Sequence, residues 1–274
     1  MRTSSLVGRS GGKADSSKNS FERHNGGSGG GKLAVVGTGP GKRGYLSRRA
    51  FEVLAQAEVI VGYKTYVALI SNLLEGKEVL STGMTREVER CNLALDRVLQ
   101  GKTVALVSSG DPGVYGMAGL VLEIMEQRGL LQSVELEIVP GITSATAAAA
   151  CLGAPLMHDF AVISLSDLLT PWEAIKKRIE FAARSDFVIV MYNPASRRRT
   201  EQIAEARKIM LEHKNPGTPV GIVRNATREG EERIVTNLEN MLEHRIDMFA
   251  TVIVGNSRTT VAGKYMITPR GYRI

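Results

Sequence analysis

LVSSGDPGVYGM, which runs from Leu106 to Met117, is the most informative segment of this chain. An apolar strand leads directly into SSGDPG, and a helix is expected to open near Tyr115. Gly110 and Gly113 permit backbone conformations or close approaches that a Cβ atom would block, and the carboxylate of Asp111 accepts hydrogen bonds from hydroxyl or N–H groups. The segment therefore brings polypeptide backbone close to a ligand, although an ordinary strand-to-helix turn has a similar composition.

Two more loops of small residues follow apolar strands, GTGPG at Gly37 to Gly41 and PGITSA at Pro140 to Ala145. Because an open α/β sheet places its ligand at the carboxyl ends of its strands, three such loops predict a bound cofactor. GTGPG does not complete a dinucleotide fingerprint, since Lys42 stands where the third glycine is required and Pro40 has no N–H for a pyrophosphate. No acidic residue closes the second strand and no G-x-x-x-x-G-K-[ST] loop is present, so NAD and ATP are disfavoured.

Strands and helices alternate from Lys32 onward, which predicts an α/β fold with a mainly parallel sheet in the first half. The expected strands lie at residues 33–36, 59–61, 103–107, 134–139, 160–164, 187–191, 220–224 and 248–254. The expected helices include one capped by Ser47, one opening at Pro171, and others at residues 86–100, 144–152 and 198–213. We expect two α/β domains, at residues 32–142 and 143–274, the second with a mixed sheet.

The helix capped by Ser47 and the helix at residues 86–100 each have an apolar face that is expected to pack on the sheet. The expected contact residues are Ala50, Phe51, Leu54 and Ala55 on one helix, and Val88, Cys91, Leu95, Val98 and Leu99 on the other.

The 274 residues carry a formal net charge of +7, of which the first 31 account for +3. Residues 1–31 are rich in Gly, Ser, Lys and Arg and lack apolar periodicity, so we expect a disordered tail. The remaining excess of +4 is scattered and does not specify a nucleic-acid partner. Apolar runs stay short of the roughly 20 residues that span a bilayer. Two cysteines, Cys91 and Cys151, are expected in the core and favour a reducing cytoplasm.

Six motifs, in chain order, resemble those of the tetrapyrrole methylase family, whose members use S-adenosylmethionine to methylate corrin and sirohaem precursors. The motifs are VVGTGPG, SSGDPGVYGM, VPGITSATAAAACLGAPL, VIVMYNPASRRR, TPVGIVRNAT and TVIVGNS, and the resemblance covers about residues 32 to 272. GYKTY, STGMTREVERC, SLSDLLTPW and MYNPASRRR are similar to the members that methylate carbon 17 of precorrin-3B or cobalt-precorrin-3 with contraction of the ring. The resemblance therefore implies this activity, within cobalamin biosynthesis.

The resemblance also implies a cofactor, S-adenosyl-L-methionine, folded in the cleft between two α/β domains of the class III methyltransferase type. The residues that it assigns to the cofactor are Pro40, Gly110, Asp111, Val114, Thr143, Ser144, Tyr192 and Ala226. After the first glycine loop this chain has Lys42-Arg43-Gly44-Tyr45, where many relatives have an acidic residue.

A tetrapyrrole substrate carries acetate and propionate carboxylates, with which guanidinium groups pair well. Three consecutive arginines follow Asn193 and Pro194 on a loop that is expected to open a helix, where the helix dipole disfavours cations unless an anion is near. Tyr63 and Arg224 are expected to line the same cleft. The substrate-binding candidates are Tyr63, Arg197, Arg198, Arg199 and Arg224.

Methyl transfer from a sulfonium is an in-line displacement that relies on positioning and desolvation, so no metal is expected, and four scattered histidines lack ligand spacing. Ring contraction also needs proton transfers, and Asp111, Tyr115 and Asp167 are candidates among which the sequence does not choose. We expect a small-molecule tetrapyrrole partner, a homodimer in the cytoplasm, and no nucleic acid or membrane. The alternatives are the same fold acting on another precorrin position, on RNA or on protein, and a non-catalytic binding module.

Overall fold

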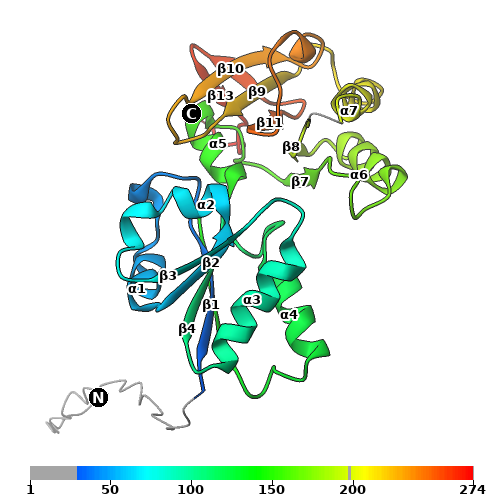
Figure 1. Ribbon diagram of the computed structural model, residues 1–274. Coiled ribbons are helices and arrows are strands. Elements are labelled where there is room, and N and C mark those ends of the chain that lie inside the picture. The colour runs from blue at the N-terminus through cyan, green and yellow to red at the C-terminus, as the bar shows by residue number, and fades with distance from the viewer. Residues whose placement is uncertain (1–29, 197–198, 274) are drawn as a thin grey trace, which may run out of the picture.

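The computed structural model describes residues 30–196 and 199–273, and it places two sheets in the two halves of the chain (Figure 1). Most of the expected disordered tail, residues 1–29, lies outside the described residues. The first half contains β1 (Lys32–Gly37), η1 (Arg43–Tyr45), α1 (Arg48–Gln56), β2 (Val59–Tyr63), α2 (Lys64–Ala68), η2 (Ser71–Leu73), β3 (Glu78–Thr82), α3 (Glu87–Leu99), β4 (Thr103–Ser108), α4 (Ala118–Gln127) and β5 (Glu135–Val139).

The first sheet has the order β3-β2-β4-β1-β5, and all of its strand pairs are parallel. Helices cover both faces, as Figure 1 shows with α1 on one side and α3 and α4 on the other. Alternate strand residues serve the two faces: Val35 and Leu106 pack under α3 and α4, whereas Val36 and Val107 pack under α1 and α2. This double cover explains why these strands read as continuous apolar runs.

The expected inner faces of α1 and α3 are confirmed in part. Five of the expected contact residues are buried, Ala50, Leu54, Cys91, Leu95 and Val98, whereas Phe51, Ala55, Val88 and Leu99 are exposed. Phe51 is 38% exposed, and Val53 takes its place in the core. Val88 and Leu99 are more than half exposed, because the inner face of α3 is turned to bury Arg90 beside Cys91, Ala94, Leu95 and Val98. A buried arginine is not part of an apolar pattern, so periodicity identified Cys91, Leu95 and Val98 but not Arg90 on this face.

The second half contains α5 (Ser144–Leu152), β6 (Gly153–Ala154), β7 (Phe160–Ser164), α6 (Trp172–Arg184), β8 (Val188–Tyr192), α7 (Gln202–Leu211), β9 (Pro219–Arg224), β10 (Glu232–Asn237), η3 (Met241–Glu243), β11 (Ala250–Val254), β12 (Thr260–Ala262) and β13 (Tyr265–Ile267). Its main sheet has the order β10-β9-β11-β8-β7, with β7 and β8 parallel and the other pairs antiparallel. The expected mixed sheet is therefore confirmed. The short strands β6, β12 and β13 form a third sheet that the sequence did not predict.

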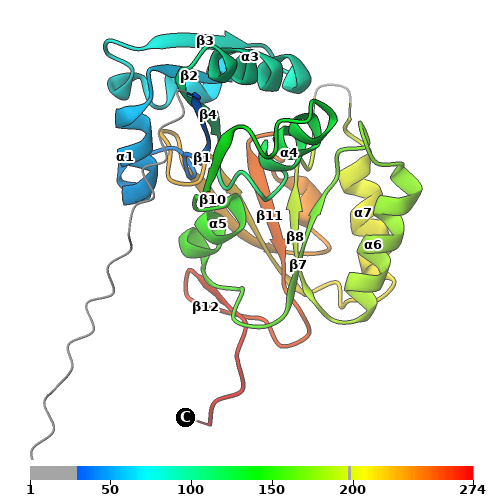
Figure 2. The ribbon, with the colours of Figure 1, turned by 90° about the horizontal axis from the view of Figure 1, so that it is seen from below.

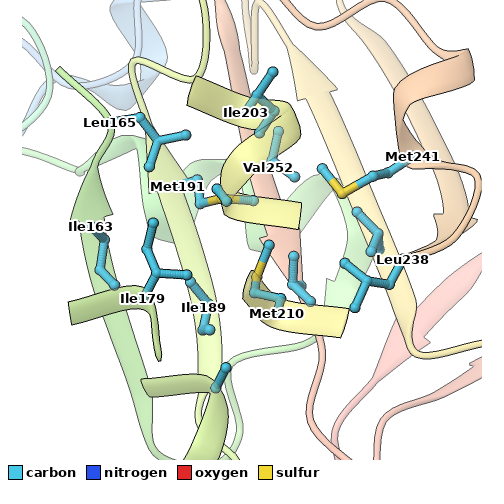
Figure 3. Close-up of a cluster of buried hydrophobic side chains, with 14 of the residues drawn as sticks. Ile163, Leu165, Ile179, Ile189, Met191, Ile203, Met210, Leu238, Met241 and Val252 are labelled. Atoms are coloured by element: carbon cyan, nitrogen blue, oxygen red, sulfur yellow. The ribbon is translucent and has the colours of Figure 1, made fainter. Parts of the chain in front are cut away.

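The main sheet of the second half is also covered on both faces. Helices α6 and α7 lie on one face and α5 on the other (Figure 2). Figure 3 shows the core under α6 and α7, where Ile189 and Met191 of β8 meet Ile179 and Met210 of the helices. No helix within residues 30–196 and 199–273 combines the length and the apolar character needed to cross a membrane.

Two expected helix starts are wrong. Tyr115 has a φ of +52°, in the left-handed region, so α4 begins only at Ala118. The helix expected from residue 198 begins at Gln202, because Ser196 and Arg199 exchange two backbone hydrogen bonds that a helix would not allow. The argument from the helix dipole for the arginine cluster therefore does not hold.

Candidate active site

The three small-residue loops meet because β4, β1 and β5 are neighbours in the first sheet. The strands are parallel, so their carboxyl ends lie at one edge, and GTGPG, SSGDPG and PGITSA follow them there. The end of β2 and the start of α2, which together carry GYKTY, lie next along the same edge. Figure 1 shows the second half of the chain above this edge, so the loops face the junction between the two domains.

Glycines at this junction let one backbone pack directly on another. A Cβ atom on Gly141 would lie 2.2 Å from the carbonyl oxygen of Gly110 and 2.9 Å from the carbonyl carbon of Gly37. A Cβ atom on Gly37 would lie 2.7 Å from both the Gly110 oxygen and the Gly141 nitrogen. Gly39 and Gly110 also exchange backbone hydrogen bonds of 3.1 and 2.8 Å. The glycines thus make one continuous surface from three loops.

Asp111 ties two of these loops together. Its Oδ1 accepts a hydrogen bond of 2.8 Å from the amide of Gly113, within its own loop, and its Oδ2 accepts one of 3.0 Å from the amide of Gly141 in the PGITSA loop. Both carboxylate oxygens therefore hold backbone. This arrangement fits a residue that shapes the site better than one that exchanges a proton.

A second group of candidates gathers around Tyr192, at the end of β8. Its hydroxyl lies 2.5 Å from the Thr143 hydroxyl and accepts a hydrogen bond of 2.6 Å from the amide of Ala145. Ser144 begins α5 at the same place, so this hydroxyl takes up one of the free amides at the helix N-terminus. Burial raises the pKa of Tyr192, which keeps the phenol neutral.

Tyr115 spans the two domains. Its hydroxyl donates to the carbonyl oxygen of Val162 at 3.1 Å and accepts from the amide of Ser164 at 3.3 Å, both on or at the end of β7. Its ring lies 5.9 Å from that of Tyr192, between centroids. Although 60% exposed, Tyr115 is therefore held by contacts with β7 and β8 of the second half of the chain.

Unusual backbone conformations are concentrated around the same cleft. Besides Tyr115, the non-glycine residues Asn193, Asn225 and Thr227 have φ between +49° and +62°, and all lie on loops that follow strands β8 and β9. Such conformations persist where the surrounding structure holds them, and they are enriched at functional sites.

Tyr63, at the end of β2, packs against the buried Arg90 of α3. The guanidinium of Arg90 lies 5.8 Å from the centroid of the Tyr63 ring, and Tyr66 packs edge-on against Tyr63 at 5.1 Å. Arg90 also donates to the Thr82 hydroxyl at 3.0 Å and to the Gly83 carbonyl at 2.9 Å. The sequence did not single out Arg90, whose guanidinium packs on the ring of the substrate-binding candidate Tyr63 and holds it in position.

The remaining arginine candidates differ in their partners. Arg197 and Arg198 lie outside the described residues. Arg199 donates to the carbonyls of Leu165 and Asn193 at 3.2 and 2.8 Å and so joins two loops. Arg224 is already paired with Asp247 at 2.9 Å and Glu232 at 3.4 Å, which makes it the weaker candidate for a substrate carboxylate.

Arg228 is the main residue that sequence reasoning missed. From the loop after β9 it reaches across the cleft, where Nε donates to the Pro40 carbonyl and Nη2 donates to the Ser109 hydroxyl at 3.1 Å. A Cβ atom on Gly41 would lie 2.7 Å from its side chain, so the last glycine of GTGPG makes room for this arginine. The RNAT motif ends one residue before it, and nothing in the sequence indicates where it points.

Three other candidates, Val114, Ala226 and Asp167, lie on loops of the two halves of the chain. Val114 is exposed on the SSGDPG loop and Ala226 is half-buried beside Arg228's loop. Asp167 is exposed and accepts a hydrogen bond from Gln202 at 3.0 Å.

A hollow of about 200 Å³ beside the loop junction is lined by residues 44–47 and 140–142. Burial raises the pKa of Cys91 to about 12, in keeping with a core thiol.

The family is now identifiable. The chain belongs to the Tetrapyrrole (Corrin/Porphyrin) Methylases, whose family model matches residues 32–242. Within that family it is similar to the cobalt-factor III methyltransferase of Priestia megaterium, with 54% identity over 89% of this chain and 45% of the relative. It is also similar to the probable cobalt-factor III C(17)-methyltransferase of Salmonella typhimurium, with 50% identity over 88% of this chain and all of the relative. The chain thus spans less than half of the first relative and the whole of the second.

Solved structures agree with this assignment. The methyltransferase CobJ superposes with a TM-score of 0.83 at 39% identity, covering 87% of this chain and 100% of that one. A uroporphyrin-III C-methyltransferase from Thermus thermophilus, solved in complex with S-adenosyl homocysteine, superposes with a TM-score of 0.63 at 25% identity and covers 82% of this chain and 97% of that one. The family and the fold class inferred from the motifs are confirmed.

Proposed function

We propose that this protein transfers a methyl group from S-adenosyl-L-methionine to carbon 17 of cobalt-factor III, with contraction of the macrocycle, in cobalamin biosynthesis. The observation that carries the proposal is the 50% identity to the probable cobalt-factor III C(17)-methyltransferase of Salmonella typhimurium, which the chain covers from end to end. The names of both relatives favour the cobalt-containing substrate over metal-free precorrin-3B.

The residues present fit the cofactor. The buried hydroxyl of Thr227 has no hydrogen-bond partner among the described residues, and it lies directly after Ala226, which is expected to close the adenosine pocket. A buried polar atom without a partner costs free energy, so a ligand atom that pairs with it would be favoured. When bound, S-adenosylmethionine supplies a methyl group on a sulfonium, which an electron-rich carbon displaces in line.

The protein contributes chiefly placement. Gly37, Gly110 and Gly141 provide a surface of backbone, and Asp111 keeps two of the loops in register. Tyr115 links the SSGDPG segment to β7 and so helps to fix the second half of the chain over the loops that are expected to hold the cofactor. No group of three or more metal-ligating side chains occurs in residues 30–196 and 199–273, so we place the cobalt in the substrate.

The proposal is tested by incubating the purified protein with methyl-labelled S-adenosylmethionine and either cobalt-factor III or precorrin-3B. We expect one label per tetrapyrrole, attached to carbon 17 by NMR, and faster transfer to the cobalt form. A product labelled at another carbon would identify a different precorrin methylase. Transfer to RNA or to protein, with none to either tetrapyrrole, would refute the proposal and favour the macromolecular alternative.

We also infer that two copies of the chain form a homodimer in the cytoplasm, as expected for the family that the motifs resemble. Light scattering from the purified protein, after size-exclusion chromatography, should give twice the mass of the 29.6 kDa chain. A single-chain mass at micromolar concentration would contradict this inference.

A further inference from the structure

Arg228 is a cation whose charge no carboxylate of the described residues neutralises. Two other arginines of the site contrast with it, because Arg224 has two carboxylate partners within 3.4 Å and Arg90 has Glu87 at 3.9 Å. Arg199 resembles Arg228 in donating only to neutral acceptors, but both of its acceptors, the Leu165 and Asn193 carbonyls, belong to the second half of the chain. The hydrogen bonds of Arg228 go to neutral acceptors, the Pro40 carbonyl and the Ser109 hydroxyl. Its remaining terminal nitrogen, Nη1, has no acceptor in the part of the chain that the structure describes.

The surroundings of Arg228 make an unpaired charge costly. The side chain is partly buried between the two domains, and burial lowers its pKa, while the Tyr66 hydroxyl acts in the opposite direction. Tyr66 is itself neutral, since burial raises its pKa. A partly desolvated guanidinium with an unused donor is a favourable partner for an anion.

Several neighbouring residues fix the position of the Arg228 side chain. Gly41 leaves the space that its side chain occupies, and the left-handed residues Asn225 and Thr227 shape the turn that projects it. The turn is also held by Glu231, whose carboxylate accepts a hydrogen bond of 2.7 Å from the amide of Thr227. The Thr227 hydroxyl, which lacks a partner among the described residues, lies next to Arg228 in the chain. Two adjacent residues in this turn thus carry polar atoms without protein partners.

We propose that Arg228 binds a carboxylate of a ligand in the cleft while it fastens the second domain to the GTGPG and SSGDPG loops. The proposal rests on the proposed function, which supplies two sources for this carboxylate. One is the methionine carboxylate of the cofactor, and the other is an acetate or propionate of the tetrapyrrole. Both present the same chemistry to a guanidinium, and the contacts with Pro40 and Ser109 place Arg228 within the loops expected to hold the cofactor.

The test compares the wild type with Arg228→Gln and Arg228→Lys, and uses Arg48→Gln as the matched control. The side chain of Arg48 is 94% exposed on α1, so its replacement should change nothing. Calorimetry gives the dissociation constants for S-adenosylhomocysteine and for 5′-methylthioadenosine, which keeps the nucleoside and thioether but lacks the carboxylate. Steady-state kinetics give the KM for cobalt-factor III, and circular dichroism reports folding.

Loss of a hydrogen bond to a charged group corresponds to about ten- to a hundred-fold in affinity. If the cofactor supplies the carboxylate, Arg228→Gln weakens S-adenosylhomocysteine by that factor and leaves 5′-methylthioadenosine unchanged. If the tetrapyrrole supplies it, KM rises by that factor and both nucleosides bind as in the wild type. Arg228→Lys keeps the charge and should recover part of either loss.

Equal weakening of both nucleosides, or no change in any of the three constants, would overturn the proposal and leave Arg228 as an inter-domain contact only. Should Arg228→Gln fail to fold, the same comparison in Arg228→Lys decides, since the lysine loses the forked geometry but keeps the charge. If the wild type transfers no methyl group to either tetrapyrrole, the proposed function fails. The comparison of the two nucleosides then still decides whether Arg228 binds the carboxylate of the cofactor. In that case, unchanged dissociation constants of Arg228→Gln for both nucleosides would overturn the proposal.

Discussion

Replacing Gly141 by alanine is expected to unfold the loop junction and abolish cofactor binding. The added methyl group would lie 2.2 Å from the Gly110 oxygen and 2.9 to 3.0 Å from the backbone of Gly37, closer than a Cβ atom approaches non-bonded backbone. These contacts are with backbone in two other loops, so no side chain can rotate away. Overpacking of this kind costs about 3 kcal/mol or more.

Urea denaturation and calorimetry with S-adenosylhomocysteine measure the two effects of Gly141→Ala. Gly119→Ala is the matched control, because a Cβ atom there meets nothing within 4 Å and the residue lies on α4. Alanine is the better helix former, so the control should be as stable as the wild type or more stable, by up to about 1 kcal/mol. A stable Gly141→Ala protein with unchanged affinity would show that the three loops do not pack as described.

Replacing Asp111 by alanine is the second change with a large expected effect. It removes both acceptors that hold the amides of Gly113 and Gly141, and the SSGDPG and PGITSA loops lose their cross-link. Hydrogen bonds to a charged group are worth about 1.5 to 3 kcal/mol each, so we expect the affinity for S-adenosylhomocysteine to fall at least a hundredfold.

Asp111→Asn sharpens this experiment, because its amide keeps one acceptor oxygen and should retain one of the two bonds. An intermediate affinity for Asp111→Asn is therefore expected. Asp96→Ala, at a half-exposed carboxylate on α3, is the control for the loss of a negative charge. Unchanged affinity in folded Asp111→Ala would refute the role of Asp111 in shaping the site.

The sequence predicted the elements of the fold well where their signals are local. Apolar runs bounded by glycine marked β1 and β4, and Ser47 caps α1 as expected. Weakly apolar strands at edges were missed, such as β3 and β10, because half of their residues face water. The burial of Arg90 was not predicted, since its partners Thr82 and Gly83 lie outside α3.

The site was predictable as a set of loops but not as a set of contacts. Glycine-rich strand ends identified GTGPG, SSGDPG and PGITSA, yet only the strand order shows that these loops are neighbours. Asp111 was expected to hold a ligand, whereas its visible partners are two backbone amides. Arg228 could not be found from sequence, because its partners Pro40 and Ser109 are 188 and 119 positions away.

The segment between β5 and α5 has a mechanical consequence. Within the described residues, the chain crosses from the first sheet to the second only here, since α5 already packs on β9 and β11. Gly141 is held by Asp111 on one side, and Thr143 is held by Tyr192 on the other, so this connection is clamped by both domains. A molecule that binds these few residues therefore sets the angle between the two lobes. We therefore expect the connection between the two lobes and the floor of the proposed ligand site to be the same piece of backbone.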